Sequence, residues 1–112
     1  MTEALGIEVS PTTDLRGALQ QSDVCITCTP SKKPFIRRED VPRGMFIAAI
    51  GADSPDKQEL DPELVASSKI VADLLAQSIA VGETHHAIAA GLMRPEQVYA
   101  ELGQIITGKI PG

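Results

Sequence analysis

Four residues that could bind or react with a small molecule each follow an apolar run of the sequence. They are Thr29, Gly51, Asp53 and Asp73. A carboxylate such as that of Asp53 can donate and accept a proton, and glycine at position 51 lets a ligand approach the backbone closely. If the apolar runs are parallel strands, their carboxyl ends share the edge of the sheet where ligands bind. An alternative stays open, in which Asp53 caps a turn that Gly51 permits.

The elements that position these residues alternate between extended and helical patterns. Apolar patterning predicts strands at Ile7–Val9, Val24–Cys28, Met45–Ile50 and Ile70–Ala72. Asp14 and Asp61 are expected to be helix N-caps, and Pro95 is expected to begin a last helix that continues through Ile105. Because at least three strands are apolar on both faces, we expect a mostly parallel sheet of about four strands between two helical layers.

The composition limits the classes of function. The chain has 112 residues, 43% of them hydrophobic, which predicts one globular domain. Its net charge of −5 argues against nucleic acid and anionic membranes as partners, since both require a positive surface. No apolar run approaches the roughly 20 residues that span a bilayer, and the N-terminus lacks the pattern of a secretory signal. We therefore expect a cytoplasmic protein.

Two further patterns are interpreted as structural. Cys25 and Cys28 form a C-x-x-C motif inside an expected strand, where residues three apart point to opposite faces, so the two sulfurs are not expected to bond. His85 and His86 are neighbours in an expected helix and therefore share no face. No pattern of cysteines or carboxylates completes a zinc site around them. We expect no metal site.

Several separate motifs resemble the ornithine cyclodeaminase/mu-crystallin family. The segment Ile50–Leu64 is similar to a signature of that family, as are Cys28–Ser31 before it and Tyr99–Gly103 after it. The similarity runs over nearly the whole chain, beginning around Leu5–Val9. It implies that residues 1–112 are a single truncated Rossmann-like nucleotide-binding domain, corresponding to the C-terminal half of the family's NAD(P)-binding domain. The expected fold is therefore an α/β, partial Rossmann-like three-layer sandwich.

The resemblance also implies roles for individual residues. Asp53 matches the acid that donates and accepts protons and touches the amino-acid substrate in the cyclodeaminases. The positions that would contact NAD or NADP are Thr29, Ile50, Gly51, Ala52 and Lys57. The implied activity is nicotinamide-dependent cyclodeamination, or oxidation and reduction of a small amino acid or imine.

The sequence departs from the family pattern in ways that affect this expectation. Asp56 stands where the family usually has glycine, which adds a negative charge near Lys57. The 112 residues contain no G-x-G-x-x-G loop, which seats the pyrophosphate of a dinucleotide. The family's N-terminal substrate-binding region is absent as well. We therefore expect little or no turnover by this chain alone, and weak or no cofactor binding.

A non-catalytic function is the alternative. The chain could be a ligand-binding or assembly module that uses the rim of its sheet or an exposed strand edge, or a folding remnant without a selected function. In a complete domain, two further strands would lie between Ile7–Val9 and Val24–Cys28. Their absence leaves Val24–Cys28 with an open edge, which favours pairing with another chain. Alternatively, Ile7–Val9 could pair with Val24–Cys28 directly. We predict a homo-oligomer.

Overall fold

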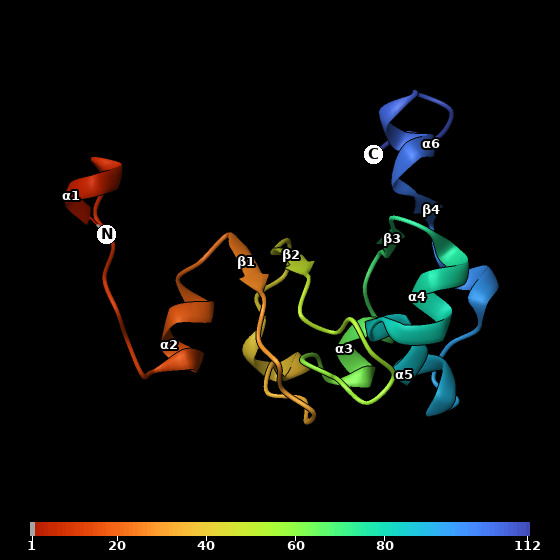
Figure 1. Ribbon diagram of the computed structural model, residues 1–112, viewed down its shortest axis with the longest axis horizontal. Helices are drawn as coiled ribbons and strands as arrows, with labels where there is room; N and C mark the ends of the chain where they lie inside the picture. Colours follow the sequence, from red (N-terminus) through yellow and green to blue (C-terminus); the bar gives the residue numbers. More distant parts are fainter. Residues whose placement is uncertain (1) are drawn as a thin grey trace.

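The computed structural model describes residues 2–112, in which short helices alternate with short strands (Figure 1). The helices are α1 (Thr2–Leu5), α2 (Leu15–Gln20), α3 (Pro62–Ala66), α4 (Leu75–Val81), α5 (Glu83–Ala89) and α6 (Leu102–Ile106), with 3-10 turns η1 (Arg38–Asp40) and η2 (Pro95–Gln97). The strands are β1 (Val24–Thr27), β2 (Phe46–Ala49), β3 (Val71–Ala72) and β4 (Ala100–Glu101). None of the helices in this part of the chain is long and apolar enough to cross a bilayer.

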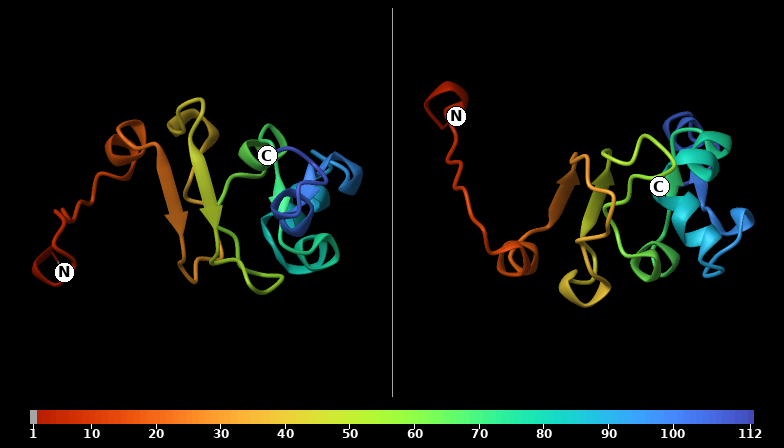
Figure 2. Two further views of the ribbon diagram at one scale, coloured as in Figure 1. Left: turned by 90° about the horizontal axis from the view of Figure 1, so that it is seen from above. Right: turned by 60° about the horizontal axis from the view of Figure 1, so that its bottom comes forward.

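The strands form two parallel pairs rather than the single sheet of about four strands that we expected. β1 pairs with β2, with Val24 opposite Phe46 and Thr27 opposite Ala49, and Figure 2 shows these two strands running side by side in the same direction. β3 pairs with β4 through two residues of each strand. The α/β class and the parallel direction of the strands are confirmed.

The first predicted strand is wrong. Residues 7–13 form neither helix nor strand, and they carry α1 away from the rest of the chain (Figure 1). In the described part of the chain, β1 pairs with β2 alone, so the direct pairing of Ile7–Val9 with β1 does not occur. Three alternating residues form a strand only where a neighbouring strand supplies hydrogen-bond partners.

Capping side chains define two helices as the sequence predicted. The carboxylate of Asp14 accepts a hydrogen bond from the Gly17 N–H at 3.1 Å, and that of Asp61 accepts one from the Glu63 N–H at 3.0 Å. Each bond satisfies a backbone donor that the helix itself leaves without a partner. Pro62 follows at the first helical position.

The predicted last helix is divided into three elements. Pro95 begins η2, and β4 and then α6 follow. The N–H of Tyr99 donates to the carbonyl of Ile70 at 2.9 Å, which begins the pairing of this segment with β3. A strand partner therefore overrides the helical spacing of the apolar residues in this segment.

One face of the β1–β2 pair packs on the core and the other does not. The buried core cluster consists of Leu19, Ile36, Leu60, Leu64, Val65, Ala87 and Met93. Cys25 and Ile47 pack against it from the sheet. On the opposite face Val24, Ile26 and Phe46 are 57%, 63% and 63% exposed. We expected β1 to be apolar and covered on both faces. That expectation is wrong for the face that carries Val24 and Ile26, because no described element covers it.

Candidate functional site

The carboxyl ends of β1 and β2 meet at one rim of their sheet. The backbone N–H groups of Ile50 and Gly51 both donate to the carbonyl of Thr27, at 2.8 and 3.1 Å. These bonds keep the loop after β2 beside the loop after β1, which contains Thr29. The structure therefore brings Thr29 and Gly51 together, as parallel strands require.

A buried carboxylate that the sequence analysis missed joins the two loops. The side chain of Glu59 has no exposed surface. Its Oε2 atom accepts hydrogen bonds from the Thr29 N–H at 2.7 Å and the Thr29 hydroxyl at 2.8 Å. Its Oε1 atom accepts one from the Gly51 N–H at 2.9 Å. Bonds of this kind to an ionised acceptor are short and strong, so Glu59 fixes both loops of the rim.

The space beside Gly51 explains why this position carries glycine. A Cβ atom there would lie 2.4 Å from the Thr29 carbonyl oxygen and 2.5 Å from Oε1 of Glu59. Both distances are far shorter than van der Waals contact. Gly51 therefore lets the Thr29 backbone and the Glu59 carboxylate approach the end of β2, and it does so without a left-handed backbone conformation.

Asp53 lies on the solvent side of this rim, next to Lys57. Its N–H donates to the Gly51 carbonyl at 3.0 Å, and its Oδ1 atom accepts a hydrogen bond from Nζ of Lys57 at 2.8 Å. That hydrogen bond, and then the positive charge of Lys57, lower the pKa of Asp53 below its ordinary value. The same contact raises the pKa of Lys57. At neutral pH Asp53 is therefore an exposed, ionised carboxylate.

Asp56 adds a negative charge near Lys57, but its carboxylate contacts mainly Ser54 and Lys32. Its carboxylate accepts a hydrogen bond from the Ser54 hydroxyl at 2.8 Å and lies 3.3 Å from Nζ of Lys32. The Ser54 hydrogen bond, followed by that from Lys32, lowers the pKa of Asp56. Lys57 remains hydrogen-bonded to Asp53.

Helix α5 holds the segment that carries Glu59. The buried carboxylate of Glu83 accepts hydrogen bonds from the N–H of Glu59 at 2.6 Å and the N–H of Leu60 at 3.3 Å. Burial raises the pKa of Glu83, although these backbone bonds oppose the shift. Nε2 of His86 lies 2.6 Å from the Lys57 carbonyl. Since a carbonyl only accepts, that nitrogen carries the proton.

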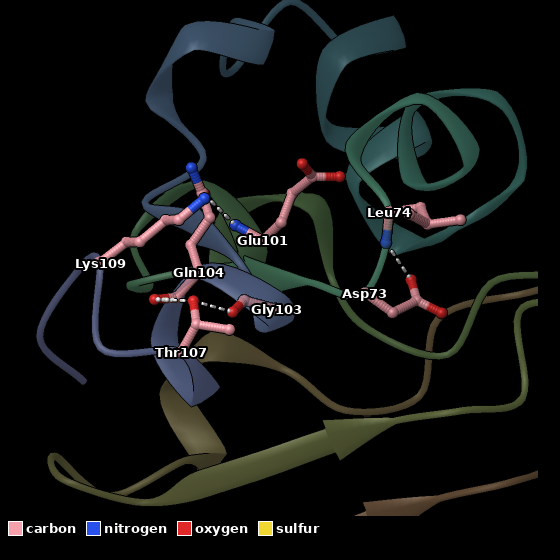
Figure 3. Close-up of a pocket in the computed structure, with 7 residues that line it drawn as sticks. All are labelled: Asp73, Leu74, Glu101, Gly103, Gln104, Thr107 and Lys109. Atoms are coloured by element: carbon pink, nitrogen blue, oxygen red, sulfur yellow. Dashed lines mark hydrogen bonds between the residues drawn. The ribbon is translucent and has the colours of Figure 1, made fainter.

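Of the other candidate residues, Ile50 and Ala52 lie beside Gly51 at the rim, whereas Asp73 lies elsewhere. Ile50 is largely exposed and Ala52 is buried. Asp73 caps its own turn by accepting the Leu74 N–H at 2.8 Å. It lines a shallow pocket of about 240 Å³ at the ends of β3 and β4 (Figure 3). Since neither Asp53 nor the Glu59 network lines this pocket, the structure does not add Asp73 to the rim.

The cysteines of the C-x-x-C motif are not bonded to each other. Cys25 and Cys28 are both free thiols. Cys28 is exposed, whereas burial raises the pKa of Cys25. Among residues 2–112, no group of histidine, cysteine and carboxylate side chains is arranged to hold a metal ion.

The fold matches those of NAD-dependent oxidoreductases with Rossmann-like domains. Iminosuccinate reductase of Paracoccus denitrificans, solved in complex with NAD+, superposes on 99% of this chain with a TM-score of 0.92 and 42% identity. Δ1-pyrroline-2-carboxylate reductase of Thermococcus litoralis, solved with NADH and L-proline, also covers 99% of the chain, with a TM-score of 0.92 and 28% identity. The chain covers 34% and 35% of those two chains, respectively.

The sequence comparisons define the family. The model of the ornithine cyclodeaminase/mu-crystallin family matches residues 1–112. Alanine dehydrogenase of Archaeoglobus fulgidus is 46% identical over 86 residues, which is 77% of this chain and 27% of that enzyme. This chain belongs to the ornithine cyclodeaminase/mu-crystallin family, and it spans about a third of the length of the relatives that it matches.

Proposed function

We propose that residues 1–112 form one Rossmann-like unit that supplies the nicotinamide-facing rim of an NAD(P)-dependent oxidoreductase. Its substrate would be a small amino acid or the corresponding imine. In this proposal Asp53 exchanges protons with the substrate. The cofactor contacts come from Thr29, Ile50, Gly51, Ala52 and Lys57.

One observation carries the proposal: two residues expected to contact the cofactor and the expected acid lie at one rim. Thr29 and Gly51 are bound to the same Glu59 carboxylate, and Asp53 hydrogen-bonds to the Gly51 carbonyl. The similarity of the whole chain to an NAD+-bound reductase supports the same interpretation.

The residues present fit the nicotinamide end of the cofactor. The Asp53 side chain is 72% exposed at the rim, beside the backbone of Gly51. When bound, the nicotinamide supplies or accepts the hydride. In the oxidative direction Asp53 would take the proton that the amine releases as it becomes an imine, and in the reductive direction it would return that proton. Lys57 would orient the Asp53 carboxylate through its hydrogen bond.

We propose that turnover needs more than these 112 residues. The sequence lacks a G-x-G-x-x-G loop, and such a loop provides the backbone N–H groups that bind the pyrophosphate. The isolated chain would therefore bind NADH or NADPH weakly or not at all. Cyclodeamination with loss of ammonia is the variant of this chemistry that an amino-acid substrate with a side-chain amine would allow.

A second candidate function, an assembly module, is favoured by the uncovered face of the β1–β2 pair. Val24, Ile26 and Phe46 present an apolar surface there. β1 has no second strand partner among residues 2–112. A second copy of the chain could cover the face and pair with this edge.

A segment exchange tests the enzymatic proposal. The part of the Paracoccus iminosuccinate reductase that matches this chain would be replaced by residues 1–112, and NADH oxidation with iminosuccinate would be measured. We expect a folded enzyme that retains nicotinamide-dependent reduction, because residues 1–112 would replace the nicotinamide contacts of the segment that was removed. A folded exchange protein that binds no NADH would contradict the proposal.

A further inference from the structure

We infer that Glu59 is the positioning residue of the rim, a role that rests on the proposed function. Glu59 would not touch the cofactor itself. Its carboxylate would set the positions of Thr29 and Gly51, and thereby the backbone that faces the nicotinamide.

The hydrogen bonds at Glu59 require a side chain that only accepts. Two donors from Thr29 converge on Oε2, and the Gly51 N–H points to Oε1. Both oxygens of a carboxylate accept, whereas a glutamine amide has one accepting oxygen and one NH2 group that donates. In either orientation, glutamine would therefore place its NH2 group against an N–H group of the rim.

The backbone of Glu59 is held as firmly as its side chain. Glu83 binds the N–H groups of Glu59 and Leu60 from helix α5, so the carboxylate is carried on a fixed segment. Among the ion pairs of the described residues, Glu59 takes part in none. Its hydrogen bonds to the rim therefore provide the stabilisation that a buried carboxylate requires.

The Thr29 amide gives the sharper readout of this contact. The Thr29 N–H donates to Glu59, whereas the Gly51 N–H is shared between Glu59 and the Thr27 carbonyl. Loss of the carboxylate should therefore affect the Thr29 amide more strongly than the Gly51 amide. A general loss of stability would instead also affect the Phe35 amide, which donates to the Glu59 backbone carbonyl, and the Asp61 amide, which donates to the Ile36 carbonyl.

Nuclear magnetic resonance of the 112-residue chain tests the inference. In Glu59→Gln we expect the Thr29 amide proton to move upfield and to exchange at least tenfold faster, with a smaller change at Gly51 and unchanged Phe35 and Asp61 amides. The matched control is Glu96→Gln, which makes the same chemical change at an exposed carboxylate in η2. An unchanged Thr29 amide in Glu59→Gln would overturn the inference.

The unmodified chain provides a measurement that does not depend on the folding of a variant. A scalar coupling across the hydrogen bond, from the Thr29 amide nitrogen to the Glu59 carboxyl carbon, is expected, and its absence would overturn the inference. Neither result requires the chain to bind NADH. Failure of the proposed function would appear in the segment exchange, and failure of the positioning role would appear at the Thr29 amide.

Discussion

Gly51 occupies a position of the rim that has no room for a side chain. Substitution by alanine would place a Cβ against the Thr29 carbonyl and the Glu59 carboxylate. We expect Gly51→Ala to lower the free energy of unfolding by about 1–3 kcal/mol, because one of the two loops must move. Urea denaturation measures this change. Gly103→Ala in α6 is the control, since a Cβ atom at that position would meet nothing within 4 Å. An equal loss in both variants would contradict the close-packing explanation.

The pair formed by Asp53 and Lys57 predicts a pH dependence. Because Lys57 lowers the pKa of Asp53, the pair stabilises the folded state above the ordinary aspartate pKa. This contribution is lost as the pH falls through the lowered value. In Lys57→Met the pKa of Asp53 should rise toward its ordinary value, measured by carbon-13 titration of the carboxyl group. Asp56 should keep its low pKa, since Ser54 and Lys32 hold it; equal shifts at both aspartates would contradict this assignment.

The sequence was sufficient to nominate the exposed residues of the rim but not the residue that joins them. Thr29, Gly51 and Asp53 follow apolar runs, so their place at the strand ends can be predicted from patterning and the family resemblance. Glu59 lies in the same signature segment as Gly51, yet an isolated glutamate in a loop is usually exposed. Its burial depends on donors from Thr29, which lies thirty residues earlier, and no local pattern predicts this contact.

At the level of elements, Glu83 couples α5 to the segment of Glu59. Because burial raises the pKa of Glu83, the Glu83 carboxyl group binds its proton more tightly in the folded state than in the unfolded chain. The contribution of Glu83 to stability therefore falls as the pH rises from about 4.3, the ordinary glutamate value, through the raised value. Urea titrations at several pH values give the free energy of unfolding of the wild type and of Glu83→Gln. The wild-type value minus the variant value should fall over this pH range. If the free energies of unfolding of the wild type and Glu83→Gln changed with pH in parallel, Glu83 would not be the group responsible. Glu96→Gln provides the control.

Other elements show what limits prediction at this scale. Asp14 and Asp61 act within one turn of chain, so their capping roles could be predicted from sequence. The strand β4 could not, because its pairing with β3 joins residues separated by almost thirty positions. Ile7–Val9 alternates apolar and polar residues as a strand does, but it forms no strand in this structure. Local patterns thus predicted these caps, and they failed at Ile7–Val9 and at β4, where the absence or presence of a distant strand partner decides the structure.

For the molecule as a whole, the uncovered face of the β1–β2 pair predicts self-association. The apparent mass in light scattering should rise above 11.9 kDa with concentration. Phe46→Lys should shift the chain toward the monomer, because a charge on this face opposes its burial. Ile106→Lys introduces the same charge at a residue that is 74% exposed in α6 and should leave the mass unchanged. A wild-type chain that stays monomeric at all concentrations would contradict this proposal.

The proposed function depends on proton exchange between Asp53 and the substrate at the rim formed by Thr29 and Gly51. The most direct test compares kcat for Asp53→Asn and Asp56→Asn in the Paracoccus reductase that carries residues 1–112. We expect Asp53→Asn to lower kcat by about 100-fold or more, as the loss of a general acid–base group does. Asp56→Asn, which alters an exposed carboxylate in the same loop, should retain most of the activity. Equal activity in the two variants would contradict the proposed role of Asp53.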